Sequence, residues 1–89
     1  MQEKTITIIN KLGLHARAAA KFVQTAAGFQ SDVTVFSNNR EVNGKSIMGI
    51  MMLAAGKGKE VRITTVGTDE EDAIAALIDL IENRFGEDE

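Results

Sequence analysis

The sequence predicts an α+β fold with the element order βαββαβα. Four short segments rich in β-branched residues are interleaved with three stretches whose apolar residues have helical spacing. The connections between them are short, which favours an antiparallel sheet with the helices covering one face. At 89 residues we expect a single domain, residues 1–89, that is too small to enclose a large substrate cavity.

The first two elements are a strand and a helix. Thr5–Ile9 alternates, with Ile6 and Ile8 on one face, which is typical of a half-buried strand. Residues 16–27 then have an apolar face at helical spacing and an outer face that includes Lys21 and Gln24. The apolar face consists of Ala19, Phe22, Val23, Ala26 and Ala27. We expect Gly28 to end this helix in the left-handed conformation.

A hairpin and a short helix follow. Asp32–Ser37 has Val33 and Val35 on one side, and Asn38-Asn39 is a tight turn into a third strand, Arg40–Asn43. We expect the second helix over residues 47–55, with Ser46 as its N-cap and a stop at residues 56–58.

The last two elements are a strand and a long helix. Glu60–Val66 directs Val61 and Ile63 to the core. Residues 68–71 form a capping box at the start of the final helix, where acidic residues also suit the helix dipole. This helix is expected to end at Gly86, and its inner stripe is Ile74, Leu77, Ile78, Ile81 and Phe85.

The candidate site is the only histidine, His15, which lies between the first strand and the alanine-rich helix. The N–H groups at a helix N-terminus lack helical partners, and the dipole favours negative charge there, so such an end binds anions. Arg17 adds a cation whose fork matches phosphate oxygens. A neutral imidazole nitrogen is a competent nucleophile near neutral pH. This pattern predicts a histidine that accepts a phosphoryl group, with a surface or capping histidine as the alternative.

Two motifs resemble one known family. Gly13-Leu14-His15-Ala16-Arg17, with Asn43-Gly44-Lys45-Ser46-Ile47-Met48-Gly49 about thirty residues later, is similar to the histidine-containing phosphocarrier (HPr) family of the bacterial phosphotransferase system. The resemblance covers nearly the whole chain and implies an open-faced β-sandwich, with a four-stranded antiparallel sheet and three helices on one face. The family usually has proline where this chain has Ala18. We expect alanine to make the loop less preorganised, at a cost of roughly 0.4–1 kcal/mol in stability through the entropy of the unfolded chain.

The resemblance implies a mechanism. Enzyme I, charged from phosphoenolpyruvate, would donate a phosphoryl group to the δ1 nitrogen of His15, which passes it to a histidine of an enzyme II A-type acceptor. The backbone N–H groups of Ala16 and Arg17 would stabilise the phosphoryl oxygens, and the Arg17 side chain would offset their charge. The protein would then be a stoichiometric carrier and not a turnover enzyme, with no cofactor and no metal.

The segment around Ser46 predicts a docking surface. Residues 47–55 are apolar except for Gly49, yet a short helix on a sheet can bury only one side. We therefore expect Ile50 and Leu53 to be buried and other apolar side chains to be exposed as a partner site. Of these, Ile47, Met48 and Met51 match the family's docking surface. Ser46 matches the family's regulatory phosphorylation site, which would make an HPr kinase/phosphorylase a further partner.

Composition excludes other classes of function. A net charge of −3 and the absence of Trp and Tyr argue against nucleic-acid binding. There is no cysteine, signal peptide or apolar run of membrane length, so we expect a cytoplasmic monomer without membrane contact. A P-loop requires glycine where this chain has Asn39, so Gly44-Lys45-Ser46 is no nucleotide site. Two alternatives stay open: a small acyl-phosphate hydrolase, and a purely regulatory binding module that leaves His15 unused.

Overall fold

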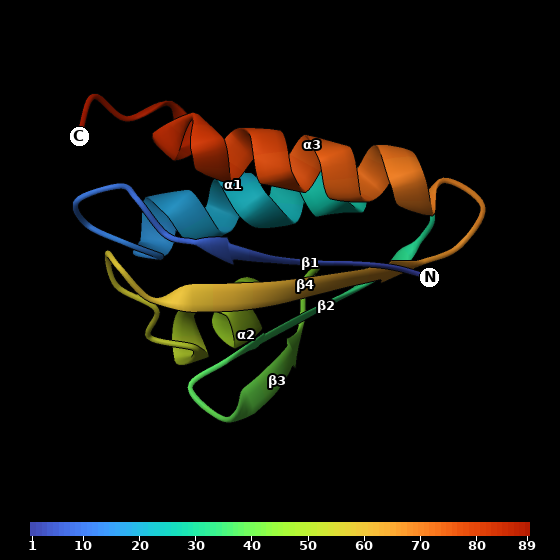
Figure 1. Ribbon diagram of the computed structural model, residues 1–89, viewed down its shortest axis with the longest axis horizontal. Helices are drawn as coiled ribbons and strands as arrows, with labels where there is room; N and C mark the ends of the chain where they lie inside the picture. The colour runs from blue at the N-terminus through green and yellow to red at the C-terminus, as the bar shows by residue number, and fades with distance from the viewer.

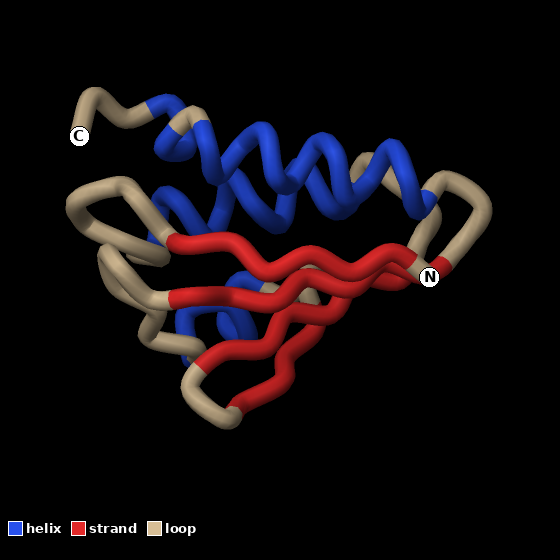
Figure 2. The backbone as a smooth tube through the Cα atoms, viewed as in Figure 1, coloured by secondary structure: helices blue, strands red, loops and turns tan.

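A four-stranded antiparallel sheet and three helices on one of its faces make up the fold (Figures 1 and 2). The computed structural model describes residues 1–89. The elements, in chain order, are β1 (Gln2–Thr7), α1 (Ala16–Ala27), β2 (Asp32–Ser37), β3 (Arg40–Asn43), α2 (Ile47–Met52), β4 (Glu60–Val66) and α3 (Glu70–Glu82), followed by a 3₁₀ turn, η1 (Arg84–Gly86). The predicted fold class, the element order and the bounds of α1, β2, β3 and β4 are confirmed.

The sheet has the spatial order β1-β4-β2-β3, so its two central strands come from distant parts of the chain. Ile6 of β1 pairs with Val61, and Val35 of β2 pairs with Ile63. Strand alternation therefore places Val33, Val35, Val61 and Ile63 on the covered face, where all four are buried. α3 packs over β1 and β4, whereas α2 packs against β3 and against α1.

β1 covers a different range from the predicted strand. It begins at Gln2 and ends at Thr7, two residues before the predicted end. Ile8 is nevertheless fully buried, and its backbone bonds Lys59 and Gly58 beyond the regular ladder. Ile9 is exposed and lies in the loop of residues 8–15, which leads from β1 to His15.

The ends of the first two helices also correct the prediction. α1 does end before Gly28, but this glycine has φ −73° and is right-handed, so its lack of a Cβ is not what ends the helix. Lys21 is half-buried, not on the outer face, because its ammonium donates a hydrogen bond to the Phe85 carbonyl. α2 ends at Met52, and Ala54 adopts φ +51°, which turns Leu53 and Ala55 into the core.

α3 differs from the prediction at both ends. The predicted capping box is wrong, because the N-cap is Asp69 and its side chain makes no capping bond. The Asp69 carboxylate instead accepts hydrogen bonds from the N–H groups of Gln30 and Ser31 and from the Ser31 hydroxyl, so it joins α3 to the loop before β2. The helix ends at Glu82 and not at Gly86. Phe85 is fully buried, as predicted for a residue of the inner stripe, but it belongs to the turn η1 and not to α3.

Candidate functional site

The loop of residues 8–15 is held in place by the segment that follows α2 and by a hydrogen bond within the loop itself. The Leu14 N–H bonds the Ala55 carbonyl at 3.0 Å, and the Asn10 amide bonds the Gly13 carbonyl at 2.9 Å. Gly13 has φ +66°, and a Cβ there would lie 2.6 Å from the Gly56 Cα atom. Only glycine permits this close approach, which fixes the point at which the chain enters α1.

His15 is the N-cap of α1, as its place in the sequence predicts. Its backbone is extended (φ −73°, ψ 176°), and its Nδ1 accepts a hydrogen bond from the Arg17 N–H at 3.2 Å. This contact makes His15 a capping residue, and it also orients the ring. About a quarter of the side chain is exposed (27%), so the ring remains open to a partner.

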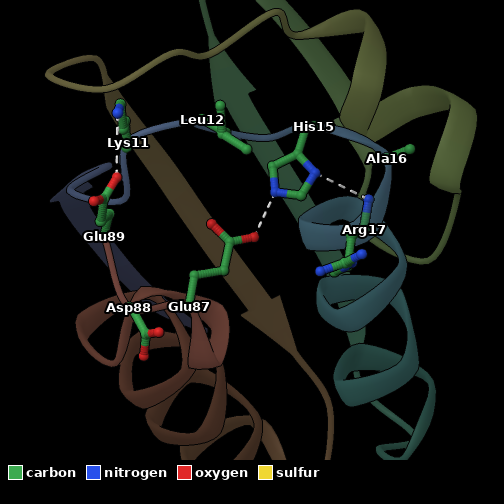
Figure 3. A pocket seen from close by; sticks show the side chains of 8 residues that line it. All are labelled: Lys11, Leu12, His15, Ala16, Arg17, Glu87, Asp88 and Glu89. Atoms are coloured by element: carbon green, nitrogen blue, oxygen red, sulfur yellow. Dashed lines mark hydrogen bonds and ion pairs between the residues drawn. The ribbon is translucent and has the colours of Figure 1, made fainter.

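The second ring nitrogen faces a carboxylate from the other end of the chain. Nε2 of His15 lies 2.5 Å from Oε2 of Glu87 (Figure 3). Oε1 of Glu87 accepts a hydrogen bond from the buried Asn10 amide at 3.0 Å. The Asn10 hydrogen bond, and after it the contact with His15, hold the pKa of Glu87 below its ordinary value. The carboxylate is therefore ionised at neutral pH.

An open pocket of about 660 Å³ surrounds His15. Figure 3 shows the residues that line it: Lys11, Leu12, His15, Ala16, Arg17, Glu87, Asp88 and Glu89. Lys11 is paired with Glu89 at 3.2 Å, whereas the guanidinium of Arg17 makes no hydrogen bond or ion pair. Three carboxylates also line the pocket, so the unpaired Arg17 guanidinium and the N-terminus of α1 are the groups there that suit a small anion such as a phosphoryl group.

The first turn of α1 shows what the two predicted backbone donors do. The N–H of Ala16 precedes the first helical hydrogen bond, that of Ala19 to the His15 carbonyl, and has no helical acceptor. The N–H of Arg17 is already bonded to Nδ1 of His15. Ala18 is fully buried, and its N–H also precedes the first helical bond, so the proline usual in the family would remove no helical hydrogen bond here.

The second motif forms an exposed apolar surface beside α1. The Ser46 hydroxyl accepts a hydrogen bond from the Gly49 N–H at 3.0 Å, which confirms the predicted N-cap. Ile50 and Leu53 are buried, and the three predicted docking residues are exposed: Ile47, Met48 and Met51. The Lys45 ammonium donates to the Phe29 carbonyl, so it is part of the fold.

Sequence reasoning missed three residues near the two motifs. Met52 (54% exposed) extends the apolar surface of α2, and Leu12 (67% exposed) adds an apolar side chain at the rim of the pocket. An apolar residue between the turn residues Asn10 and Gly13 could have indicated Leu12. Glu87 carries no such signal, because 72 positions separate it from His15.

The structure contains no cluster of three or more histidine, cysteine or carboxylate side chains that could hold a metal ion. None of its helices has both the length and the apolar character needed to cross a membrane.

Comparison with known proteins gives one consistent result. Residues 2–83 match the family model of the PTS HPr component phosphorylation site. The chain is 58% identical over its whole length to the phosphocarrier protein HPr of Neisseria meningitidis, with both chains fully covered. It is 58% identical over 85 residues, 94% of each chain, to the phosphocarrier protein HPr of Pseudomonas aeruginosa.

Solved structures agree with this result. A crystal structure of HPr from Thermoanaerobacter tengcongensis superposes with a TM-score of 0.96 at 56% identity, with both chains fully covered. HPr from Bacillus anthracis superposes with a TM-score of 0.86 at 45% identity, over 90% of this chain and 95% of that one.

The fold and site define a small α+β protein that presents one histidine at a helix N-terminus, beside an open pocket and an apolar surface. The chain belongs to the HPr family, the phosphocarriers of the phosphotransferase system.

Proposed function

We propose that Nδ1 of His15 accepts a phosphoryl group from enzyme I, which is charged from phosphoenolpyruvate, and passes it to an enzyme II A-type acceptor. The observation that carries this proposal is the hydrogen bond from the Arg17 N–H to Nδ1. A nitrogen that accepts a hydrogen bond holds a lone pair, which is what a nucleophile needs. The unpaired Arg17 guanidinium lines the same pocket and supplies a cation for the incoming group.

The backbone donors complete the phosphate site. Once Nδ1 is bonded to phosphorus, it can no longer accept the Arg17 hydrogen bond, and this N–H turns to a phosphoryl oxygen. The N–H of Ala16 is the second donor. The Arg17 side chain offsets the negative charge while the group arrives and leaves. We propose that this site acts as a stoichiometric carrier and not as a turnover enzyme.

The exposed side of α2 is the proposed docking surface. Ile47, Met48 and Met51 lie on the helix that packs against α1, the helix that begins at His15. Flexible methionine side chains suit a surface that must fit enzyme I and then an enzyme II A-type acceptor. Ser46, at the start of the same helix, is the proposed regulatory site of an HPr kinase/phosphorylase. We further propose that residues 1–89 act as one cytoplasmic domain and as a monomer, although a dimer structure is known for the Thermoanaerobacter relative.

Incubation with enzyme I and labelled phosphoenolpyruvate tests the function. A carrier takes up one acid-labile phosphate per molecule. Continuous release of phosphate would instead indicate an acyl-phosphate hydrolase. Absence of label would leave the purely regulatory binding module.

His15 is expected to be the only acceptor, because the chain has no other histidine. The variant His15→Ala should fold and carry no acid-labile phosphate, as measured by the same labelling and by thermal unfolding. Labelling of this variant at the wild-type rate would contradict the assignment.

A further inference from the structure

The C-terminal segment is folded back onto the start of α1 by an unusual turn. Arg84, Phe85 and Gly86 all have positive φ, at 54°, 55° and 77°. Two consecutive non-glycine residues rarely adopt this conformation unless other contacts hold them. Here Phe85 is fully buried in the core, and its carbonyl accepts the Lys21 ammonium at 2.6 Å. The turn thus directs the next residue, Glu87, toward the N-terminus of α1.

Glu87 arrives at His15 with its carboxylate already oriented. One oxygen accepts from the buried Asn10 amide, and this same amide holds the Gly13 carbonyl of the His15 loop. The other oxygen lies 2.5 Å from Nε2 of His15, and the Glu87 side chain is only 15% exposed. The backbone of the tail is tied to the loop as well, because the Lys11 N–H bonds the Glu89 carbonyl at 3.0 Å.

We propose that Glu87 is a positioning residue for phosphoryl transfer, which keeps a proton on Nε2 of His15 and the lone pair on Nδ1. An ionised carboxylate can only accept hydrogen bonds, so its contact with Nε2 requires a proton on that nitrogen. The Arg17 N–H can only donate, so its contact with Nδ1 requires a lone pair there. Both contacts therefore select the same tautomer, the one that can attack through Nδ1.

The transfer then needs no movement of a proton. The Nδ1 lone pair forms the bond to phosphorus while the bond from phosphorus to the donor breaks and its electron pair returns to the donor atom. The ring keeps its Nε2 proton and becomes a phosphorylated imidazolium with a positive charge, which the Glu87 carboxylate stabilises. When the group leaves for the acceptor, the electron pair of the N–P bond returns to Nδ1 and restores the neutral ring.

The decisive variant is Glu87→Gln. The Asn10 amide would hold the glutamine carbonyl oxygen, so the glutamine NH₂ group would face Nε2 with a donor in place of an acceptor. We expect the His15 ring to shift its proton toward Nδ1, as seen in the ¹⁵N chemical shifts of the neutral ring. We also expect phosphorylation by charged enzyme I to slow by roughly 10- to 100-fold, which corresponds to the loss of one hydrogen bond to a charged group.

Two further variants isolate the effect. Glu71→Gln makes the same substitution at an exposed residue in the first turn of α3, outside the His15 pocket, and the Glu71 side chain makes no hydrogen bond or ion pair, so tautomer and rate should stay as in the wild type. Glu87→Asp keeps a carboxylate and should retain the wild-type tautomer with part of the rate. It also serves if the glutamine variant is poorly folded.

The outcomes separate this inference from the proposed function, on which its kinetic part rests. If the wild type takes no phosphate from enzyme I, the proposed function fails, and the ¹⁵N shifts still decide whether Glu87 sets the tautomer. A wild-type ring with its proton on Nδ1 would overturn the inference. So would Glu87→Gln with unchanged shifts, whether or not its transfer rate falls.

Discussion

His15 uses both of its ring nitrogens in the unphosphorylated protein. Nδ1 is bonded to the first turn of α1, and Nε2 is bonded to the C-terminal tail. The ring is therefore held from two sides before any partner arrives. Such preorganisation lowers the entropic cost of reaching the geometry in which transfer occurs.

Arg17 is the residue whose charge should matter most during transfer. Arg17→Glu should slow phosphorylation by enzyme I by about 10²-fold, because the pocket then repels the incoming group. Arg17→Lys should be intermediate, since a point charge lacks the fork geometry of a guanidinium. Quenched-flow assays of phosphoryl transfer from enzyme I measure the rates of both variants.

The melting temperature of the Arg17 variants should stay near that of the wild type, because this exposed guanidinium bonds to nothing in the protein. Lys4→Glu is a matched control, with the same change of charge on an exposed residue of β1. Wild-type rates in Arg17→Glu would mean that the backbone N–H groups alone are enough.

At the scale of single residues, the sequence predicted those parts of the site that are adjacent in the chain. His15, Ala16 and Arg17 are adjacent in the chain, so a strand, a loop and a helix were enough to place them at a helix N-terminus. Glu87 meets Asn10 and His15 only because a buried phenylalanine and a left-handed turn bring the tail back. No local pattern encodes such a contact.

At the scale of elements, α2 combines a capping serine with an exposed apolar side. Ser46→Asp should keep or slightly raise the melting temperature, because a negative charge at a helix N-terminus is favourable. It should also slow phosphorylation of His15, since the charge would lie beside the proposed docking surface and would repel a partner with a negatively charged contact face.

Ser46→Ala should have the opposite effects. It removes the hydrogen bond to the Gly49 N–H and should cost roughly 1 kcal/mol of stability, with transfer near normal. Transfer rates are best compared at low salt, where charges are least screened. Equal rates in the Asp and Ala variants would leave Ser46 as a helix cap only.

Met48, the most exposed residue of α2 at 71%, should be an anchor for enzyme I. Met48→Asp should weaken binding by on the order of 2 kcal/mol or more, without loss of thermal stability. A binding titration beside thermal unfolding measures both quantities. Ala75→Asp, on the exposed side of α3, is the control for an added charge elsewhere. Normal binding of Met48→Asp would place the interface on another surface.

The elements themselves were predictable where apolar periodicity is clear, and less so at their ends. α1 and three of the four strands have the predicted bounds, because alternation and helical spacing persist to their last residues. The ends of α2 and α3 depend on tertiary contacts instead. Ala54 turns Leu53 and Ala55 inward, and Asp69 binds the neighbouring loop in place of its own helix.

At the scale of the whole molecule, three carboxylates couple stability to pH. The Ser31 hydroxyl lowers the pKa of Asp69, the N-terminal amino group lowers that of Glu70, and the Asn10 amide lowers that of Glu87. Each group binds protons less readily in the folded chain than in the unfolded one. Each therefore stabilises the fold above its ordinary pKa of 3.8 (Asp) or 4.5 (Glu), and this stabilisation is lost as the pH falls through the lower folded value.

We therefore expect the free energy of unfolding to fall as the pH drops below about 4.5. Urea unfolding between pH 7 and pH 2.5 measures this. Asp69→Asn should show a shallower loss on acidification, whereas Asp88→Asn, at a group that bonds to nothing, should follow the wild type. Constant stability down to pH 3 would show that these contacts do not persist in solution.

The pairing of β1 with β4 limits the order in which the strands can fold. Gln2 lies opposite Thr65, so the first strand synthesised must wait for most of the chain before it finds its partner. Closing such a long loop is slow compared with forming a helix or a hairpin. On the ribosome, the β2–β3 hairpin can form first, and the edge strand joins only after β4 has emerged. The loop that carries His15 follows directly from this last strand to dock, so we expect the proposed phosphate site to be complete only in a fully synthesised and folded chain.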